Sequence, residues 1–292
     1  MTMSRPAPLA STGIRENAPL LIIALAAAGG VAGLVTWVHW IATGDAAWVN
    51  AFFRYPNAVF TVVVCLLEAG FCFEAWRQFE PGDALRPAWF WLLLASLAHF
   101  TGRVLGLPGS ETVAATQLVS MKELGEVIGG PIQMSLLFAG LANVAVHCRK
   151  LGILRRLTRI DYALLLLLAA LTVRTTIGIS AYTSAGKPVT WVVAVLWTSD
   201  PLLLLLLAVS VALHRSAANL GHGMIANCWR SFVVAIVLTS LGSASTWCLD
   251  CTVTPIWTSL GWYVWLFADA AFALGPAFQL AALERARVGV RF

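Results

Sequence analysis

Charge is what this chain has least of. Only 11% of its 292 residues are Asp, Glu, Lys or Arg, whereas an ordinary soluble domain carries roughly 25%. Hydrophobic residues make up 59% of the chain. This number of charged side chains is too small to cover the surface of a water-soluble globule. The composition therefore excludes a soluble protein and predicts a chain whose solvent is lipid.

Familiar chemical motifs are also missing. The sequence has no G-x-x-x-x-G-K-[ST], no H-E-x-x-H and no G-x-S-x-G, so nucleotide hydrolysis, gluzincin-type proteolysis and ordinary esterase chemistry have no support. No two of the five His are spaced i, i+3 or i, i+4, and the sequence therefore predicts no metal site. The longest interruption between apolar stretches, residues 108–125, is too short for a soluble domain.

What the chain does have is a series of long apolar stretches. Each is near the ~20 residues that a helix needs to cross a 30 Å hydrocarbon core. They predict an all-α, polytopic membrane protein with eight transmembrane helices. The predicted spans are residues 19–41, 55–76, 87–107, 127–146, 162–181, 190–213, 232–247 and 256–280.

The basic residues predict the orientation of the chain. With the N-terminus in the cytoplasm, most of them fall in the cytoplasmic segments, and few fall outside, which satisfies the positive-inside rule and favours an inner-membrane protein with both termini cytoplasmic. The net charge of +5 therefore indicates contact with anionic lipid rather than with nucleic acid. The inside set is Arg5, Arg15, Arg77, Arg86, Arg149, Lys150, Arg155, Arg156, Arg159, Arg215, Arg230, Arg285, Arg287 and Arg291, and the outside set is Arg54, Lys122 and Lys187.

A weak internal repeat divides the spans into two sets of four. Gly130-Pro131 matches Gly275-Pro276 at an offset of 145 residues, and Pro56 matches Pro201. Four spans per half make the halves parallel, with Pro131 and Pro276 as helix breaks facing the interface between halves. The alternative is chance recurrence in a chain with 23 Gly and 12 Pro.

The repeat suggests a division of the chain into five segments. These are a cytoplasmic tail (1–18), a first four-helix half (19–147), a basic cytoplasmic loop (148–160), a second half (161–284) and a cytoplasmic tail (285–292).

Ionisable residues inside the spans are the candidates for function, because each costs roughly 2.5–3.5 kcal/mol in hydrocarbon on insertion scales. Most lie at the midplane or toward the outside, which predicts a polar cavity that opens outward and binds or transports a small solute or ion. The alternative is a set of ion pairs that only specify helix packing, Arg103 with Glu123 or Glu126 and Arg174 with Asp200. The candidates are Glu68, His99, Arg103, Glu123, Glu126, Arg174, Asp200 and Asp269.

The spacing of these residues favours an ion-coupled carrier. His99 and Arg103 are four residues apart and share one helix face, where Gly102 would allow a neighbouring helix to approach. The guanidinium of Arg103 suits an anionic ligand. Glu68 and Asp269, nearer the midplane, suit a cation or a carried proton.

A membrane redox protein is an alternative. A b-type haem needs two imidazoles from different helices at similar depth, and His39 and His99 satisfy that condition. His39 also lies between Trp37 and Trp40, where it reads more simply as part of an interfacial aromatic belt in a chain with 13 Trp.

Cys248 and Cys251 form a C-x-x-C at the predicted outer end of the seventh span. A structural disulfide is the favoured interpretation, because that side of the membrane is oxidising. The pair also resembles the quinone-linked, disulfide-generating membrane proteins, but the second exterior pair of those proteins is missing here. The remaining cysteines lie within a span or on the cytoplasmic side: Cys65, Cys72, Cys148 and Cys228.

Two further interpretations stay open. The polar residues could hold together a non-transporting sensor or the partner of a membrane complex, or they could serve an enzyme that acts on a lipid-borne substrate. Gly29, Gly30 and Gly33 supply a small-residue face for tight helix packing or for a homo-oligomer.

Overall fold

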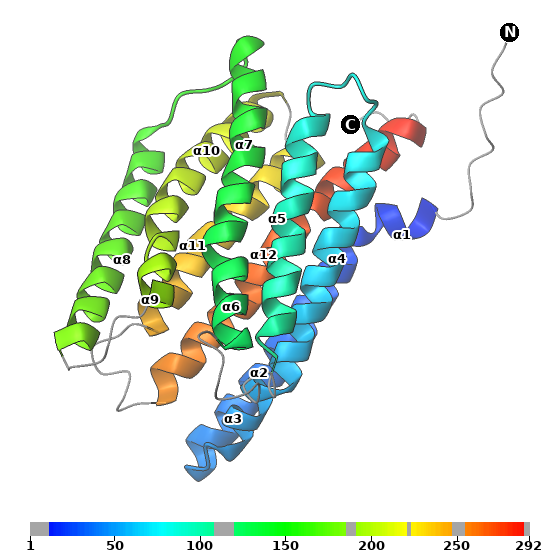
Figure 1. The fold of residues 1–292 in the computed structure, drawn as a ribbon. Coiled ribbons are helices and arrows are strands. Elements are labelled where there is room, and N and C mark those ends of the chain that lie inside the picture. The colour runs from blue at the N-terminus through cyan, green and yellow to red at the C-terminus, as the bar shows by residue number, and fades with distance from the viewer. Residues whose placement is uncertain (1–11, 108–119, 185–190, 221–222, 247–254, 289–292) are drawn as a thin grey trace, which may run out of the picture.

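The computed structural model describes residues 12–107, 120–184, 191–220, 223–246 and 255–288, which are helical with short connections and contain no strand (Figure 1). Eight of the described helical stretches are long and apolar enough to cross a membrane, so the all-α architecture is confirmed and the number of candidate spans agrees with the prediction. The elements are α1 (Thr12–Glu16), α2 (Ala18–Thr43), α3 (Ala47–Arg54), α4 (Pro56–Gln78), α5 (Arg86–Leu105), α6 (Met121–Val127), the π-helix η2 (Ile128–Ile132), α7 (Gln133–Lys150), α8 (Arg159–Ser184), α9 (Trp191–Leu196), α10 (Ser199–Leu220), α11 (Met224–Thr246) and α12 (Pro255–Val288).

The helices differ from the predicted spans mainly at their ends. The second crossing is a stretch from Ala47 to Gln78 that combines α3 and α4. The seventh begins at Met224, eight residues before the predicted start, because the helix continues past its apolar stretch into the polar residues Asn227 and Arg230. The apolar pattern therefore marks only part of this helix and not its full length.

Proline and glycine explain several helix ends. Pro19, Pro56 and Pro87 lie in the first turns of α2, α4 and α5, where a backbone N–H would have no helical partner. Gly44 closes α2 in the left-handed conformation (φ 73°), and its N–H donates to the carbonyl of Trp40. Glycine adopts this conformation without the steric cost that a side chain adds.

One end of the bundle, which we call the terminal end, holds α1, the last turn of α12 and the connections at 79–85 and 151–158 (Figure 1). Ion pairs tie its helices together: Arg15 contacts Glu74 of α4 at 2.8 Å and Glu284 of α12 at 3.8 Å. The basic residues described at this end are Arg15, Arg77, Arg86, Arg149, Lys150, Arg155, Arg156, Arg159, Arg215, Arg230, Arg285 and Arg287.

The centre of the bundle is α12. In its most apolar stretch 78% of the residues are buried in the protein, compared with 17% in α8. It packs against α11, α4 and α2. A small-residue face makes the α2 contact possible: a Cβ on Gly30 would lie 2.7 Å from Phe267, and one on Gly33 would lie 2.8 Å from Tyr263. The predicted glycine face of the first span therefore packs within the chain.

The two proline-containing helices behave differently. Pro131 lies in η2, where one π-helical turn joins α6 to α7. A π-turn absorbs an extra residue in a helix and is often found at functional sites. Pro276, by contrast, lies inside α12, which continues as α-helix on both sides of it. The two prolines therefore do not produce the same local structure.

Candidate functional site: a buried polar cluster between α4, α5 and α12

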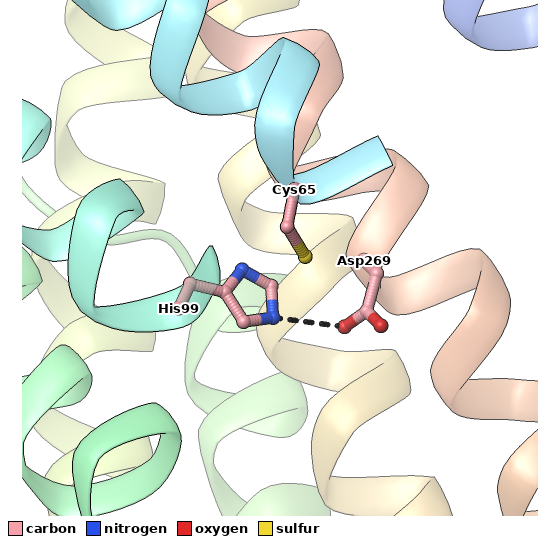
Figure 2. Close-up of side chains that lie close together, drawn as sticks. All are labelled: Cys65, His99 and Asp269. Atoms are coloured by element: carbon pink, nitrogen blue, oxygen red, sulfur yellow. Dashed lines mark hydrogen bonds and ion pairs between the residues drawn. The ribbon is translucent and has the colours of Figure 1, made fainter. Parts of the chain in front are cut away.

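Five polar side chains meet where α4, α5 and α12 pack together. Cys65 and Glu68 are three residues apart on α4, and His99 and Arg103 are four apart on α5, so each pair projects from one helix face. Asp269 projects from α12 toward both. Figure 2 shows Cys65, His99 and Asp269 pointing toward one another. We call these five residues the polar cluster.

His99 links the three helices. Its Nδ1 lies 2.8 Å from Glu68 Oε2 and its Nε2 lies 3.1 Å from Asp269 Oδ1. The three residues are 2%, 5% and 2% exposed. A neutral imidazole carries only one N–H, so two contacts with carboxylate oxygens require one further proton, on the ring or on a carboxyl group. The geometry therefore indicates a proton shared within this group.

Arg103 completes the charge balance. Its guanidinium donates to Asp269 Oδ1 at 2.7 Å, so this oxygen is approached by both Arg103 and His99. With an imidazolium at His99, two positive groups face two carboxylates and the cluster is neutral. Two atoms remain unmatched: within the described part of the chain, Asp269 Oδ2 and Arg103 Nε are buried without a hydrogen-bond partner.

Cys65 is the fifth member, and it is fully buried. Its sulfur, a ring nitrogen of His99 and a carboxylate oxygen of Asp269 all lie within 4.8 Å of one another. These are three of the usual side-chain ligands of transition metals. Nothing in the sequence singles out Cys65 by itself, but its i, i+3 spacing from Glu68 places it on the same face of the helix.

The polar cluster is closed by a packed side chain on one side and is partly exposed on another. The edge of Phe272 closes one side, with its ring centroid 5.8 Å from that of His99. On another side the Arg103 side chain is 36% exposed. His99 lies six residues before the end of α5 at Leu105, about 9 Å along the helix. The cluster thus lies near the middle of the bundle, with Arg103 toward the end opposite the terminal end.

Two predicted site residues precede η2. The carboxylate of Glu123 accepts hydrogen bonds from the backbone N–H of Ser120 at 2.9 Å and from its hydroxyl at 3.0 Å, and so forms the capping box of α6. Glu126 is exposed one turn later, within electrostatic range of Lys122 and Arg103. The strong ion pair of Arg103 is with Asp269, a pairing that the alternative based on packing did not include.

The two candidates of the second half lie elsewhere. Arg174 is an exposed residue of α8, and Asp200 is a half-buried residue in the first turn of α10, near Thr175 of α8. Since α8 packs against α10 and α11, this region is separate from α4 and α5. The structure therefore brings together four of the eight predicted residues: Glu68, His99, Arg103 and Asp269.

The alternatives for redox chemistry gain little from the structure. The ring of His39 packs on Trp48, with centroids 4.6 Å apart, near the end of α2. His99 is 2% exposed and packs among Glu68, Asp269 and the edge of Phe272, whereas His39 lies on a different face of the bundle beside Trp48, so the two imidazoles do not face one another in a shared site. Cys248 and Cys251 lie outside the described residues, and the cysteines described as free thiols are Cys65, Cys72, Cys148 and Cys228.

The bundle packing and the polar cluster carry the functional interpretation on their own. No protein-family model, curated protein or solved structure matches the chain.

Proposed function

We propose that this membrane protein binds a small solute or ion at the polar cluster and carries it across the membrane. The observation that supports the proposal most is the convergence of Glu68, His99, Arg103 and Asp269 from three helices. Glu68 and Asp269 are about 200 residues apart in the chain, yet His99 joins them at 2.8 and 3.1 Å. Ionisable residues that are buried in a bundle interior in this way mark substrate and ion pathways.

The unmatched atoms favour binding over packing alone. A buried polar network that serves only to hold helices together is most stabilising when every donor and acceptor is satisfied. Asp269 Oδ2 and Arg103 Nε have no partner among the described residues. They are the atoms that a ligand would satisfy, which is why we prefer a binding site to a purely structural network.

The pattern of helix contacts supports the four-plus-four repeat. The pair α4 and α5 corresponds to α10 and α11, and the pair α5 and α7 corresponds to α11 and α12; all four pairs are packed. Contacts between the halves correspond in part: α12 packs on α4 as α7 packs on α10, whereas α12 also packs on α2 and α8 packs on α10 and α11 instead. In this arrangement the polar cluster lies between the halves, where transporters of this kind build their sites.

The proposed orientation follows from charge. The terminal end carries most of the basic side chains, so it would face the cytoplasm of an inner-membrane protein. Arg103 is the exposed member of the cluster and lies toward the opposite end. Access to the cluster would then be from outside. The two described pockets lie elsewhere: one between α11 and α12, lined by residues that include Asn227 and Phe278, and one between α2 and α3, lined by residues that include Thr36 and Trp48.

Proteoliposomes loaded with a pH-sensitive dye test the proposal. Gradients of phosphate, short carboxylates, Na⁺ or K⁺ are applied, and proton-linked flux is compared between the unaltered protein, Asp269→Asn and Arg103→Ala. Glu80→Gln, on the exposed connection between α4 and α5, is the matched control. We expect flux with at least one gradient that both cluster variants abolish and the control retains. Equal rates for all four proteins would overturn the carrier proposal.

A further inference from the structure

We infer that Cys65, His99 and Asp269 form a binding site for a divalent transition-metal ion of the Zn²⁺ type. The inference rests on the proposed function, because it names the class of ion that the polar cluster would bind. The three side chains come from α4, α5 and α12, and none is more than 2% exposed. Their ligand atoms already lie within 4.8 Å of one another.

The spacing of the ligand atoms is close to what a tetrahedral ion requires. Zn²⁺ binds nitrogen and oxygen at about 2.0–2.2 Å and thiolate sulfur at about 2.3 Å, which puts neighbouring ligand atoms roughly 3.3–3.6 Å apart. His99 Nε2 and Asp269 Oδ1 are 3.1 Å apart. An ion would therefore enter where the proton between them now lies, with only a small separation of the two side chains. Cys65 would close the remaining gap by a change of side-chain torsion.

The supporting residues fit the same interpretation. Glu68 lies 2.8 Å from His99 Nδ1, so the Nδ1–H can donate to this carboxylate while Nε2 is left for the ion. Metal-bound histidines usually have such a carboxylate partner, which fixes the ring and raises its basicity. Arg103 holds the Asp269 carboxylate from another side at 2.7 Å. Asp269 Oδ2, buried and without a partner among the described residues, offers an alternative ligand oxygen to Oδ1, which Arg103 holds.

The charge balance of the cluster fits a divalent ion. Without metal, and with the shared proton placed on His99, the cluster contains two carboxylates, one guanidinium and one imidazolium, with Cys65 as a neutral thiol, and its net charge is zero. Binding a divalent ion would release one proton from His99 and one from Cys65, because a metal ligand must be deprotonated. The net charge is then zero again. A monovalent ion would keep the cluster neutral by displacing only one proton, so His99 and Cys65 could not both become ligands, whereas a divalent ion displaces both protons and uses all three side chains.

The ligand types exclude the hard cations and disfavour an anion. Mg²⁺ and Ca²⁺ take six or more oxygen ligands, whereas this group offers sulfur, nitrogen and carboxylate oxygen. An anion would be attracted by Arg103 but repelled by Glu68 and Asp269. Three protein ligands leave the fourth position of a tetrahedral ion open, which is typical of exchangeable or catalytic zinc and not of closed structural sites.

Binding of Co²⁺ alone to the purified full-length protein in detergent tests the site directly. After treatment with a chelator, Co²⁺ is added and the visible absorption of tetrahedral, thiolate-bound Co²⁺ is recorded; Zn²⁺ is then added to displace it. We expect one ion per chain. Cys65→Ser should weaken binding at least tenfold and remove the thiolate absorption, and Glu68→Gln should weaken it by about 10–100-fold.

Cys72→Ser is the matched control, because Cys72 is a buried thiol on the same helix that is not part of the group of three. It should bind Co²⁺ as the unaltered protein does. Size-exclusion profiles and thermal midpoints establish that each variant is folded. The inference is overturned if the folded, unaltered protein binds no Co²⁺, or if Cys65→Ser binds it with the same affinity and absorption.

Uptake of Zn²⁺ into proteoliposomes that contain a fluorescent zinc indicator separates this inference from the proposed function. Binding with uptake supports both. Binding without uptake of Zn²⁺ or of any solute in the flux assay supports the metal site and overturns transport. Absence of binding, with a solute flux that still depends on Asp269, overturns the metal site and leaves the carrier proposal standing.

Discussion

Gly102 of α5 and Gly129 of η2 approach so closely that no side chain fits between them. A Cβ on Gly102 would lie 2.6 Å from the Cα of Gly129 and 2.7 Å from the carbonyl oxygen of Gly125. Gly102 is next to Arg103 and one turn after His99. The approach of these two backbones therefore fixes how α5 is rotated, and with it the direction of the polar face toward α4 and α12.

Gly102→Ala should destabilise the protein by about 1–3 kcal/mol, the usual cost of overpacking a tight contact. The backbone atoms that the new methyl group meets cannot turn aside as the end of a flexible side chain could. Thermal unfolding in detergent measures the effect. Gly70→Ala is the control, since a Cβ at Gly70 of α4 meets nothing within 4 Å; equal midpoints for the two variants would contradict the prediction.

Arg103→Ala should cost about 3 kcal/mol of stability, the low end for breaking a buried ion pair, because Arg103 itself is 36% exposed. The cost arises mostly from leaving the Asp269 carboxylate buried without its strongest partner. Combining Arg103→Ala with Asp269→Asn should destabilise by less than the sum of the single variants, with a coupling of about 1–2 kcal/mol. Denaturation of all four proteins in mixed micelles measures the cycle, and strictly additive effects would show that the two residues are independent.

In a second ion pair, distant from the cluster, loss of the acidic residue should cost more stability than loss of the arginine. Asp161 accepts from the backbone N–H and the hydroxyl of Thr158 at 2.7 Å, and Arg215 of α10 donates to it at 2.9 Å. Asp161→Ala removes the two hydrogen bonds by which Asp161 and Thr158 cap the start of α8, each worth about 0.5–1.5 kcal/mol, as well as the tie to α10. Arg215→Ala should cost less, since Asp161 keeps these two hydrogen bonds in the cap.

The exposed Arg156 provides the reference for that series, and Arg156→Ala should leave the thermal midpoint unchanged. A larger loss with Arg215→Ala than with Asp161→Ala would show that the tie between α8 and α10 matters more than the cap.

Tyr263→Phe should lower stability by about 0.5–1.5 kcal/mol, the net contribution of a typical hydrogen bond. The Tyr263 hydroxyl donates to the carbonyl of Gly30 at 2.9 Å, across the contact between α12 and α2. Tyr162→Phe is a suitable comparison, because Tyr162 lies exposed on α8. Urea or thermal unfolding of both variants should show a loss of stability only for Tyr263→Phe. An equal loss for Tyr162→Phe would show that the effect does not come from the hydrogen bond to Gly30.

The sequence predicts the helices well because an apolar stretch of about 20 residues is visible in a single chain, whether its helix is exposed like α8 or buried like α12. It also selects Glu68, His99, Arg103 and Asp269, since a charge within an apolar run is conspicuous. It cannot show which of them meet. Arg103 pairs with Asp269 rather than with Glu123, which is nearer in the sequence. Glu123 instead accepts hydrogen bonds from Ser120. Partner choice depends on how helices are rotated and packed, and periodicity in one chain does not encode that.

Cys65 and Pro276 also show what the sequence alone cannot predict: a site residue that looks like a packing residue, and a proline that does not break its helix. Cysteine is as apolar as its neighbours on α4, so nothing in the sequence separates Cys65 from packing residues until α5 and α12 are placed beside it. Pro276 has the sequence signature of a helix break, but α12 continues through it, because packing on α11, α4 and α2 holds the helix on both sides. Tertiary context decided both positions.

The polar cluster also imposes an order on biosynthesis. Asp269 follows Arg103 by 166 residues, and at 5–20 residues per second a ribosome needs roughly 8–30 s to cover that distance. Glu68, His99 and Arg103 are therefore synthesised well before the carboxylate that two of them contact. The cluster is complete only once α12 has been added, so its assembly is a late step that joins the first half of the chain to its last helix.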